Sequence, residues 1–178
     1  KVVTEELEPH VNLDFVWDVE GPSDISIEFT TEMVASSVVG KESAGYTPSM
    51  ILGWVDPPVG TFTFEGVEYS VPANAERNVS DVHGPLTTGA TVIHEFGHAL
   101  GMIHEHQNPF GEPIQWNEEL VLSVFRGPPN NWTEEEIRYN ILDYVPGDTH
   151  NGSDFDPDSI MIYSFPPEYT LNLEEGVS

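Results

Sequence analysis

The sequence predicts an α+β fold, with strands first and helices dominating later. The strand candidates lie before position 70, and helical patterns prevail from position 88 onward. A length of 178 residues suits one domain or two small lobes that share one cleft, and 38% hydrophobic residues can form a buried core. We therefore expect one catalytic domain over 1–178, with an N-terminal lobe of 1–101 and a C-terminal lobe of 102–178.

The first half is expected to contain one helix followed by strands. Val3, Leu7 and Val11 recur at a spacing of four, which predicts a helix over 1–10 with Pro9 near its end. Alternating or continuous apolar residues predict strands over 11–17, 25–29 and 50–55. The Glu65-Gly66 pair, flanked by apolar residues, predicts a hairpin of 62–64 and 67–69.

Helices are expected to dominate from position 88 onward. Apolar residues on one stripe predict a helix over 88–100, and Gly101 supplies its stop. Asn117 can cap a second helix, and Thr133 with Glu136 forms a capping box for a third. The segment 143–159 is expected to be rich in loops.

The charge balance excludes several classes of function. The chain has 31 acidic and 5 basic side chains, a formal net charge of -26, and no cysteine. Because five lysines and arginines are too few to form a basic patch, we expect no nucleic-acid partner and no binding to an anionic membrane. Without cysteine there is no disulfide and no thiolate chemistry. No apolar run approaches the length of a membrane span.

The stretch HEFGHALGMIH, from His94 to His104, points to a metal site. His94 and His98 lie one helical turn apart, so both imidazoles project from one face, with Glu95 on an adjacent flank. If the helix continued, His104 would lie about 15 Å along the axis from His94. Gly101 can adopt a left-handed conformation and turn the chain back toward the same metal. Three imidazoles and a water form the open tetrahedral zinc site of catalytic centres.

These residues resemble the metzincin clan of zinc endopeptidases, whose signature is H-E-x-x-H-x-x-G-x-x-H followed by a Met-turn. A glutamate directly after the third histidine, here Glu105, resembles the pattern of the astacin branch. The stretch Ser159-Ile-Met-Ile-Tyr163 resembles the astacin Met-turn, with Ile162 in place of its histidine. The resemblance implies a metzincin-like zincin fold: a twisted mixed sheet with the active-site helix in the N-terminal lobe, and an irregular, helix-containing C-terminal lobe. It also implies that Met161 forms a hydrophobic floor beneath the zinc and that Tyr163 ligates zinc at rest and swings to the transition state.

The resemblance extends beyond the two motifs but includes departures. Segments 11–15, 24–27, 52–54 and 105–109 are similar to secreted astacin-like and matrixin-like microbial proteases. The disulfides of animal astacins are impossible here, so we expect a microbial type. The resemblance implies a secreted, extracellular enzyme that is made with a pro-segment. In astacins the residue matching Glu105 meets the mature N-terminus.

The hypothesised activity is peptide-bond hydrolysis by a metal-activated water, with Glu95 as general base and Tyr163 as hydrogen-bond donor to the oxyanion. We expect a monomer whose protein or peptide substrate lies extended along an edge strand around 61–71. The alternative is a catalytically inactive zinc-binding interaction domain. A third reading is a calcium-dependent matrix module, because Asp154, Asp156 and Asp158 alternate as in a calcium loop, although a turn accounts for them better. The other histidines, His106 among them, are expected to be ordinary core or surface residues.

Overall fold

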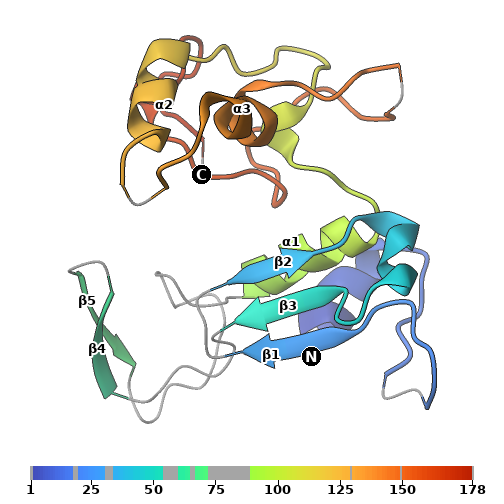
Figure 1. Cartoon of the computed structure of the whole chain (residues 1–178). Helices are drawn as coiled ribbons and strands as arrows, with labels where there is room; N and C mark the ends of the chain where they lie inside the picture. Colours follow the sequence, from blue (N-terminus) through green and yellow to red (C-terminus); the bar gives the residue numbers. More distant parts are fainter. Residues whose placement is uncertain are drawn as a thin grey trace. The chain divides into compact units, whose positions relative to one another are not determined.

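The computed structural model describes residues 2–17, 20–30, 34–53, 60–64, 67–71, 89–128, 130–148 and 150–177. The chain forms two compact units, Lys1–Met102 and Ile103–Ser178. Figure 1 shows a small sheet with a helix in the first unit, and helices joined by long irregular segments in the second. The predicted α+β class is confirmed. The assignment of both units to one catalytic domain stays a prediction.

A three-stranded mixed sheet organises the N-terminal unit. Strand β3 (Met50–Gly53) lies in the centre, pairing in parallel with β1 (Ile27–Thr30) and antiparallel with β2 (Ala35–Ser37). Met50 and Leu52 are fully or almost fully buried, which is why this short apolar run becomes the central strand. The strands predicted within 25–29 and 50–55 are confirmed, and residues 54 and 55 lie outside the described part.

The strand predicted over 11–17 is wrong, because this segment runs as irregular backbone and has no ladder partner among the residues that the structure describes. The Phe15 N–H instead donates to Glu8 Oε1 at 2.8 Å. Its ring packs edge-on against Phe96, with centroids 5.5 Å apart, and Trp17 also contacts Phe96. The alternating apolar residues reflect this aromatic packing, while Leu13 points outward and is 52% exposed.

The remaining elements of this unit follow the sequence more closely. The helix predicted over 1–10 is one wide π-type turn, Val3–Leu7, continued by a tighter 3-10 turn, Glu8–His10. A further 3-10 turn spans Gly40–Gly45. Strands β4 (Gly60–Phe64) and β5 (Val67–Val71) pair antiparallel as predicted, and the Glu65-Gly66 turn lies outside the described residues.

One apolar cluster connects the N-terminal helical turn, the sheet and helix α1 (Gly89–Ala99). Its buried members are Val3, Leu7, Met50, Leu52, Phe96 and Ala99. The helix therefore lies against the sheet through its apolar stripe, and this packing fixes the backbone that carries the histidine motif.

The C-terminal unit is built on two short helices with the predicted caps. Helix α2 (Glu118–Phe125) begins at Asn117, whose side chain accepts from the Leu120 N–H at 3.4 Å. Helix α3 (Glu134–Ile137) has the complete capping box of Thr133 and Glu136. A π-type turn, Arg138–Leu142, continues α3, and 3-10 turns span Glu105–Gln107 and Pro167–Tyr169. Residues 143–159 contain no helix or strand where they are described, as expected.

A second, separate core fills this unit. Its buried members are Ile114, Trp116, Val121, Ile137, Ile141, Leu142, Phe165 and Val177. Trp116 and Phe165 meet edge-on with ring centroids 4.8 Å apart. Because these residues come from all parts of the unit, the core ties the irregular loops to the helices.

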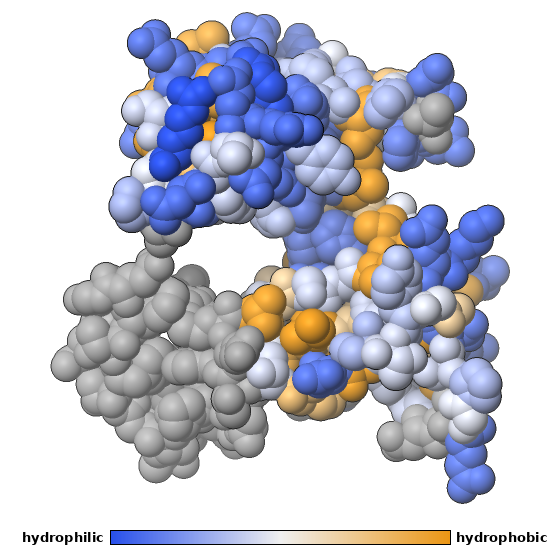
Figure 2. All heavy atoms as spheres, viewed as in Figure 1, coloured by the Kyte–Doolittle hydropathy of each residue, from blue (hydrophilic) through white to orange (hydrophobic). Residues whose placement is uncertain are grey.

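The outer face of α2 and α3 is strongly hydrophilic in Figure 2. Arg138 contacts Glu118 at 3.0 Å and Glu134 at 3.2 Å, and Arg126 contacts Glu134 at 2.5 Å. Two of the chain's five basic side chains therefore link α2 to α3. Among the described residues, none of the helices combines the length and the apolar character that a membrane crossing requires.

Candidate metal centre and active site

Helix α1 presents two histidines and one glutamate of the motif. The rings of His94 and His98 meet edge-on, with centroids 4.7 Å apart, as expected for neighbours one turn apart. His98 and Glu95 are buried, and His94 is half-buried. The predicted arrangement of the first two imidazoles on one face is therefore present in the structure.

Gly101 ends the helix in the way the sequence predicts. Its φ of +101° lies in the region that favours glycine. The Gly101 N–H donates to the His98 carbonyl at 2.8 Å, and the Met102 N–H donates to the Gly97 carbonyl at 2.9 Å. These two bonds form a Schellman motif, which satisfies the last carbonyls of the helix while the chain reverses direction.

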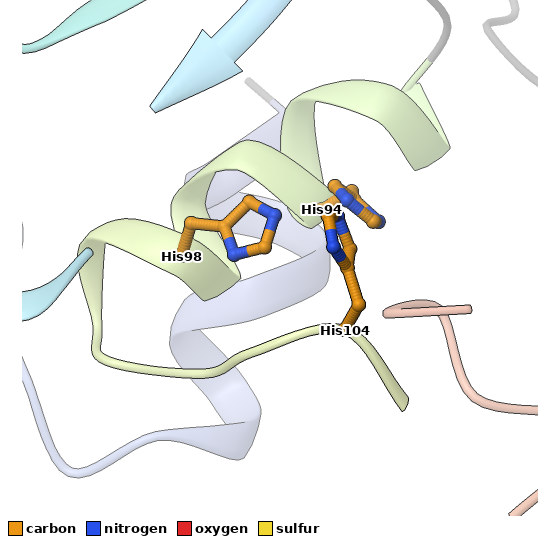
Figure 3. A group of neighbouring side chains, drawn as sticks. All are labelled: His94, His98 and His104. Atoms are coloured by element: carbon orange, nitrogen blue, oxygen red, sulfur yellow. The ribbon is translucent and has the colours of Figure 1, made fainter. Parts of the chain in front are cut away.

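The reversal brings the third histidine to the other two. One ligand atom each from His94, His98 and His104 lies within 4.8 Å of the others. Figure 3 shows His94 and His98 projecting from the helix, while His104 comes from the extended segment after the turn and approaches them. Nitrogen ligands of a tetrahedral zinc lie about 3.4 Å apart, so shifts of roughly 1 Å in the imidazoles complete the fit.

A hydrogen bond to the backbone fixes the orientation of the His98 ring. Nδ1 lies 2.9 Å from the Met102 carbonyl oxygen, which can only accept, so Nδ1 carries the proton and Nε2 keeps its lone pair. Burial lowers the pKa of His98 below its usual value, the bond to Met102 opposes this, and His94 adds to the lowering. A neutral imidazole with a free lone pair is the form that binds metal, so the donor set fits a divalent ion.

Glu95 is the second unusual group on α1. Only 5% of the residue is exposed, and its Oε2 has no hydrogen-bond partner among the described residues. Burial raises the pKa of its carboxyl to about 7. A buried carboxyl oxygen that lacks a protein partner is costly and is typical of sites that handle water or protons.

The Met-turn residues lie in the C-terminal unit near the third histidine. The ring of Tyr163 contacts that of His104, with centroids 4.2 Å apart, and its side chain is partly exposed. Met161 is buried, and its carbonyl accepts from the Glu105 N–H at 2.9 Å. The Met-turn and the segment that follows His104 are thus joined by a backbone hydrogen bond.

Glu105 is held by neutral donors within its own unit. Its Oε1 accepts from Asn108 Nδ2 at 2.7 Å and from the Asp156 N–H at 3.0 Å. The carboxylate therefore fastens the loop before the Met-turn. Asp156 Oδ1 in turn accepts from the Asp158 N–H at 3.0 Å, which agrees with a turn in this acidic stretch.

His106 is the residue at the site whose contacts the sequence did not predict. Its 1% exposure agrees with an ordinary core residue, but its ring also stacks on both His104 and Tyr163. The only signal in the sequence is its position two residues after His104. That spacing carries no information on burial, which depends on distant core residues.

The chain is similar in structure to myroilysin, a metalloprotease. One myroilysin structure matches with a TM-score of 0.67 and 29% identity, covering 90% of this chain and 67% of the other. A crystal structure of myroilysin matches with a TM-score of 0.44 and 27% identity, covering 90% and 60%. No protein-family model and no curated protein matches the chain. The first match and the three-histidine cluster together support a zinc peptidase as the general class.

Proposed function

We propose that this chain is an astacin-like zinc endopeptidase that acts on extracellular protein or peptide substrates. The observation that carries the proposal is the cluster of His94, His98 and His104, assembled by the helix end at Gly101. The similarity to myroilysin supports the same class. Neither a chance arrangement nor a structural zinc site explains why a buried carboxyl sits beside the first ligand.

The donor set favours zinc over harder cations, because imidazole nitrogen suits zinc and other borderline metals. When bound, zinc supplies Lewis acidity to a water molecule and to the substrate carbonyl. The bond from His98 Nδ1 to the Met102 carbonyl holds the ring with Nε2 as the ligand. Three protein ligands leave one position open, as in catalytic sites.

Glu95 is proposed as the general base and acid. A carboxyl whose pKa is raised to about 7 by burial can accept a proton from water and return it to the leaving amine near neutral pH. Its Oε2 has no hydrogen-bond partner among the described residues, which leaves that oxygen able to accept one. The position next to His94 on α1 supports this role.

Tyr163 is proposed to donate a hydrogen bond to the tetrahedral oxyanion. Its ring contacts His104, so the phenol belongs to the surroundings of the third ligand. Because the side chain is 41% exposed, the hydroxyl can reach a bound substrate without unfolding the Met-turn. Met161, two residues earlier in the chain, is buried and gives the turn an apolar anchor.

The substrate is proposed to bind as an added strand. The segment 61–71 stays the edge predicted from sequence, and where it is described its strands pair only with each other. Strand β2 offers another edge, because it is antiparallel, lies at the margin of the sheet and contacts α1. The Val34 carbonyl accepts from the Gly53 N–H of β3, and the Val38 N–H donates to the carbonyl of Ser49, which precedes β3. By the alternation of an antiparallel ladder, the backbone N–H and C=O groups of Ala35 and Ser37 then face away from β3, where an added strand could pair.

The decisive experiment compares the native protein with Glu95→Gln in cleavage of casein and of a peptide library read by mass spectrometry. We expect zinc-dependent cleavage by the native protein, and loss of cleavage with retained zinc content in the variant. Cleavage by the variant at the native rate would refute the role of Glu95. Zinc binding by the native protein without cleavage of any substrate would favour the alternative, an inactive interaction domain.

A further inference from the structure

Three aromatic rings in the C-terminal unit form one packed group. His106 stacks on His104 with centroids 5.2 Å apart and an interplanar angle of 21°. It also stacks on Tyr163 at 5.0 Å and 28°. His104 and Tyr163 contact each other at 4.2 Å. The ring of His106 thus lies against two of the residues to which the proposed function assigns chemistry, the third ligand and the oxyanion donor.

The same ring is also packed against the core of the unit. Phe165 meets it edge-on at 5.2 Å, and Trp116 does so at 6.3 Å. His106 Nε2 lies 3.0 Å from the Asn140 carbonyl oxygen, so this nitrogen donates. With 1% exposure, the ring has no room to rotate unless the core around it moves.

We propose that His106 is a positioning residue that fixes the ring planes of His104 and Tyr163. This proposal rests on the proposed function for the roles of those two residues. His104 lies on an extended segment after a helix end, so its backbone alone does not define the orientation of its ring. The His106 ring is itself held by Asn140, Trp116 and Phe165, and stacking on it fixes the orientation of the His104 ring.

The expected consequences differ from those of a core residue that only stabilises the fold. Groups that orient a metal ligand typically change metal affinity or activity by about 10- to 100-fold when removed. Misplacing a group that acts in the transition state lowers kcat more than it raises KM. We therefore expect His106 to affect zinc affinity through His104 and kcat through Tyr163.

Two substitutions of His106 separate the contribution of its ring stacking from that of its hydrogen bond to Asn140. His106→Gln keeps an N–H donor for the Asn140 carbonyl but has no ring, whereas His106→Phe keeps a ring of similar size without the donor. The control is His150→Gln, an exposed histidine whose Nδ1 lies 3.1 Å from the Pro146 carbonyl oxygen. We expect His106→Gln to weaken zinc binding in chelator competition about 10- to 100-fold. His106→Phe should lose much less, and the control nothing.

The state of the metal-free protein provides a readout that is independent of activity. In the native protein, NMR should show through-space contacts from the His106 ring to the rings of His104 and Tyr163. The Tyr163 ring signals, assigned with Tyr163→Phe, should shift in His106→Gln and stay close to native in His106→Phe. Absence of these contacts in the native protein would overturn the proposal even if His106→Gln failed to fold.

A double-mutant cycle tests whether the kinetic effect passes through Tyr163. At saturating zinc, His106→Gln should lower kcat about 10-fold with KM nearly unchanged, and should have little further effect in the Tyr163→Phe background. Effects that multiply fully would overturn the link to Tyr163. If the native protein cleaves nothing, the proposed function fails, but the zinc titration and the NMR contacts still decide the positioning role.

Discussion

The helix end at Gly101 offers the sharpest test of how the fold builds the site. Gly101→Ala places a β-carbon at a φ of +101°, which residues with side chains rarely adopt. The added atom would lie 3.9 Å from Gly40 Cα, an ordinary contact, so the cost arises from backbone conformation and not from a clash. We estimate this strain at about 1–2 kcal/mol.

This backbone strain should weaken the binding of zinc. The variant can relieve it by leaving the left-handed conformation, but a continued helix would carry His104 about 15 Å along the axis from His94. Zinc binding would then require the strained conformation again. The penalty of about 1–2 kcal/mol corresponds to a roughly 5- to 30-fold weaker zinc affinity.

The assay is chelator competition for zinc, with thermal unfolding of the metal-free protein measured alongside. Gly45→Ala is the matched control, because Gly45 has no positive φ and its added β-carbon meets nothing within 4 Å. We expect native affinity in the control and the 5- to 30-fold loss in Gly101→Ala. Native zinc affinity in Gly101→Ala would refute the reasoning that the glycine turn assembles the three ligands.

Three further predictions concern catalysis, pH and salt. Tyr163→Phe should lower kcat about 100-fold or more while zinc content stays native, measured with a cleaved peptide from the library. The Thr133 backbone and hydroxyl hold the pKa of Glu136 below its usual value, so the cap contributes stability at neutral pH that is lost as pH falls through that lowered pKa. The difference in Tm between the native protein and Glu136→Gln should therefore shrink in acid, and a constant difference would contradict it. Salt or divalent cations should raise the Tm of the native protein, whereas a flat response between low and molar salt would contradict the role of charge repulsion.

Much of the site could be predicted from sequence because it depends on local rules. The spacing of His94 and His98 follows from helical periodicity, and the reversal at Gly101 follows from the conformational freedom of glycine. The capping box of Thr133 and Glu136 is equally local. Each of these features is determined by residues within one or two helical turns.

The features that sequence reasoning missed all depend on distant partners. The segment 11–17 has the period of a strand, but a strand also needs a neighbour with unpaired backbone groups, and Phe15 instead bonds to Glu8 and packs on Phe96. The burial of His106 likewise depends on Trp116 and Phe165. Alternation and spacing describe which faces are apolar, and they do not describe what will cover those faces.

The way carboxylates are held explains the sign of the salt prediction. Glu105 and Glu136 accept hydrogen bonds from amides, backbone N–H groups and a hydroxyl, which are neutral donors. Within the described part of the chain, the ion pairs are those of Arg126 and Arg138 with Glu118 and Glu134, and these side chains are exposed enough for screening to cost little. Where the structure describes the chain, salt therefore weakens few attractive contacts, while it screens repulsion among the 31 acidic residues of the sequence. Hydrogen bonds from neutral donors, such as those to Glu105 and Glu136, are hardly affected by ionic strength, whereas surface ion pairs are weakened by it. We therefore expect added salt to stabilise this protein, although the same salt would destabilise a protein that depends on surface ion pairs.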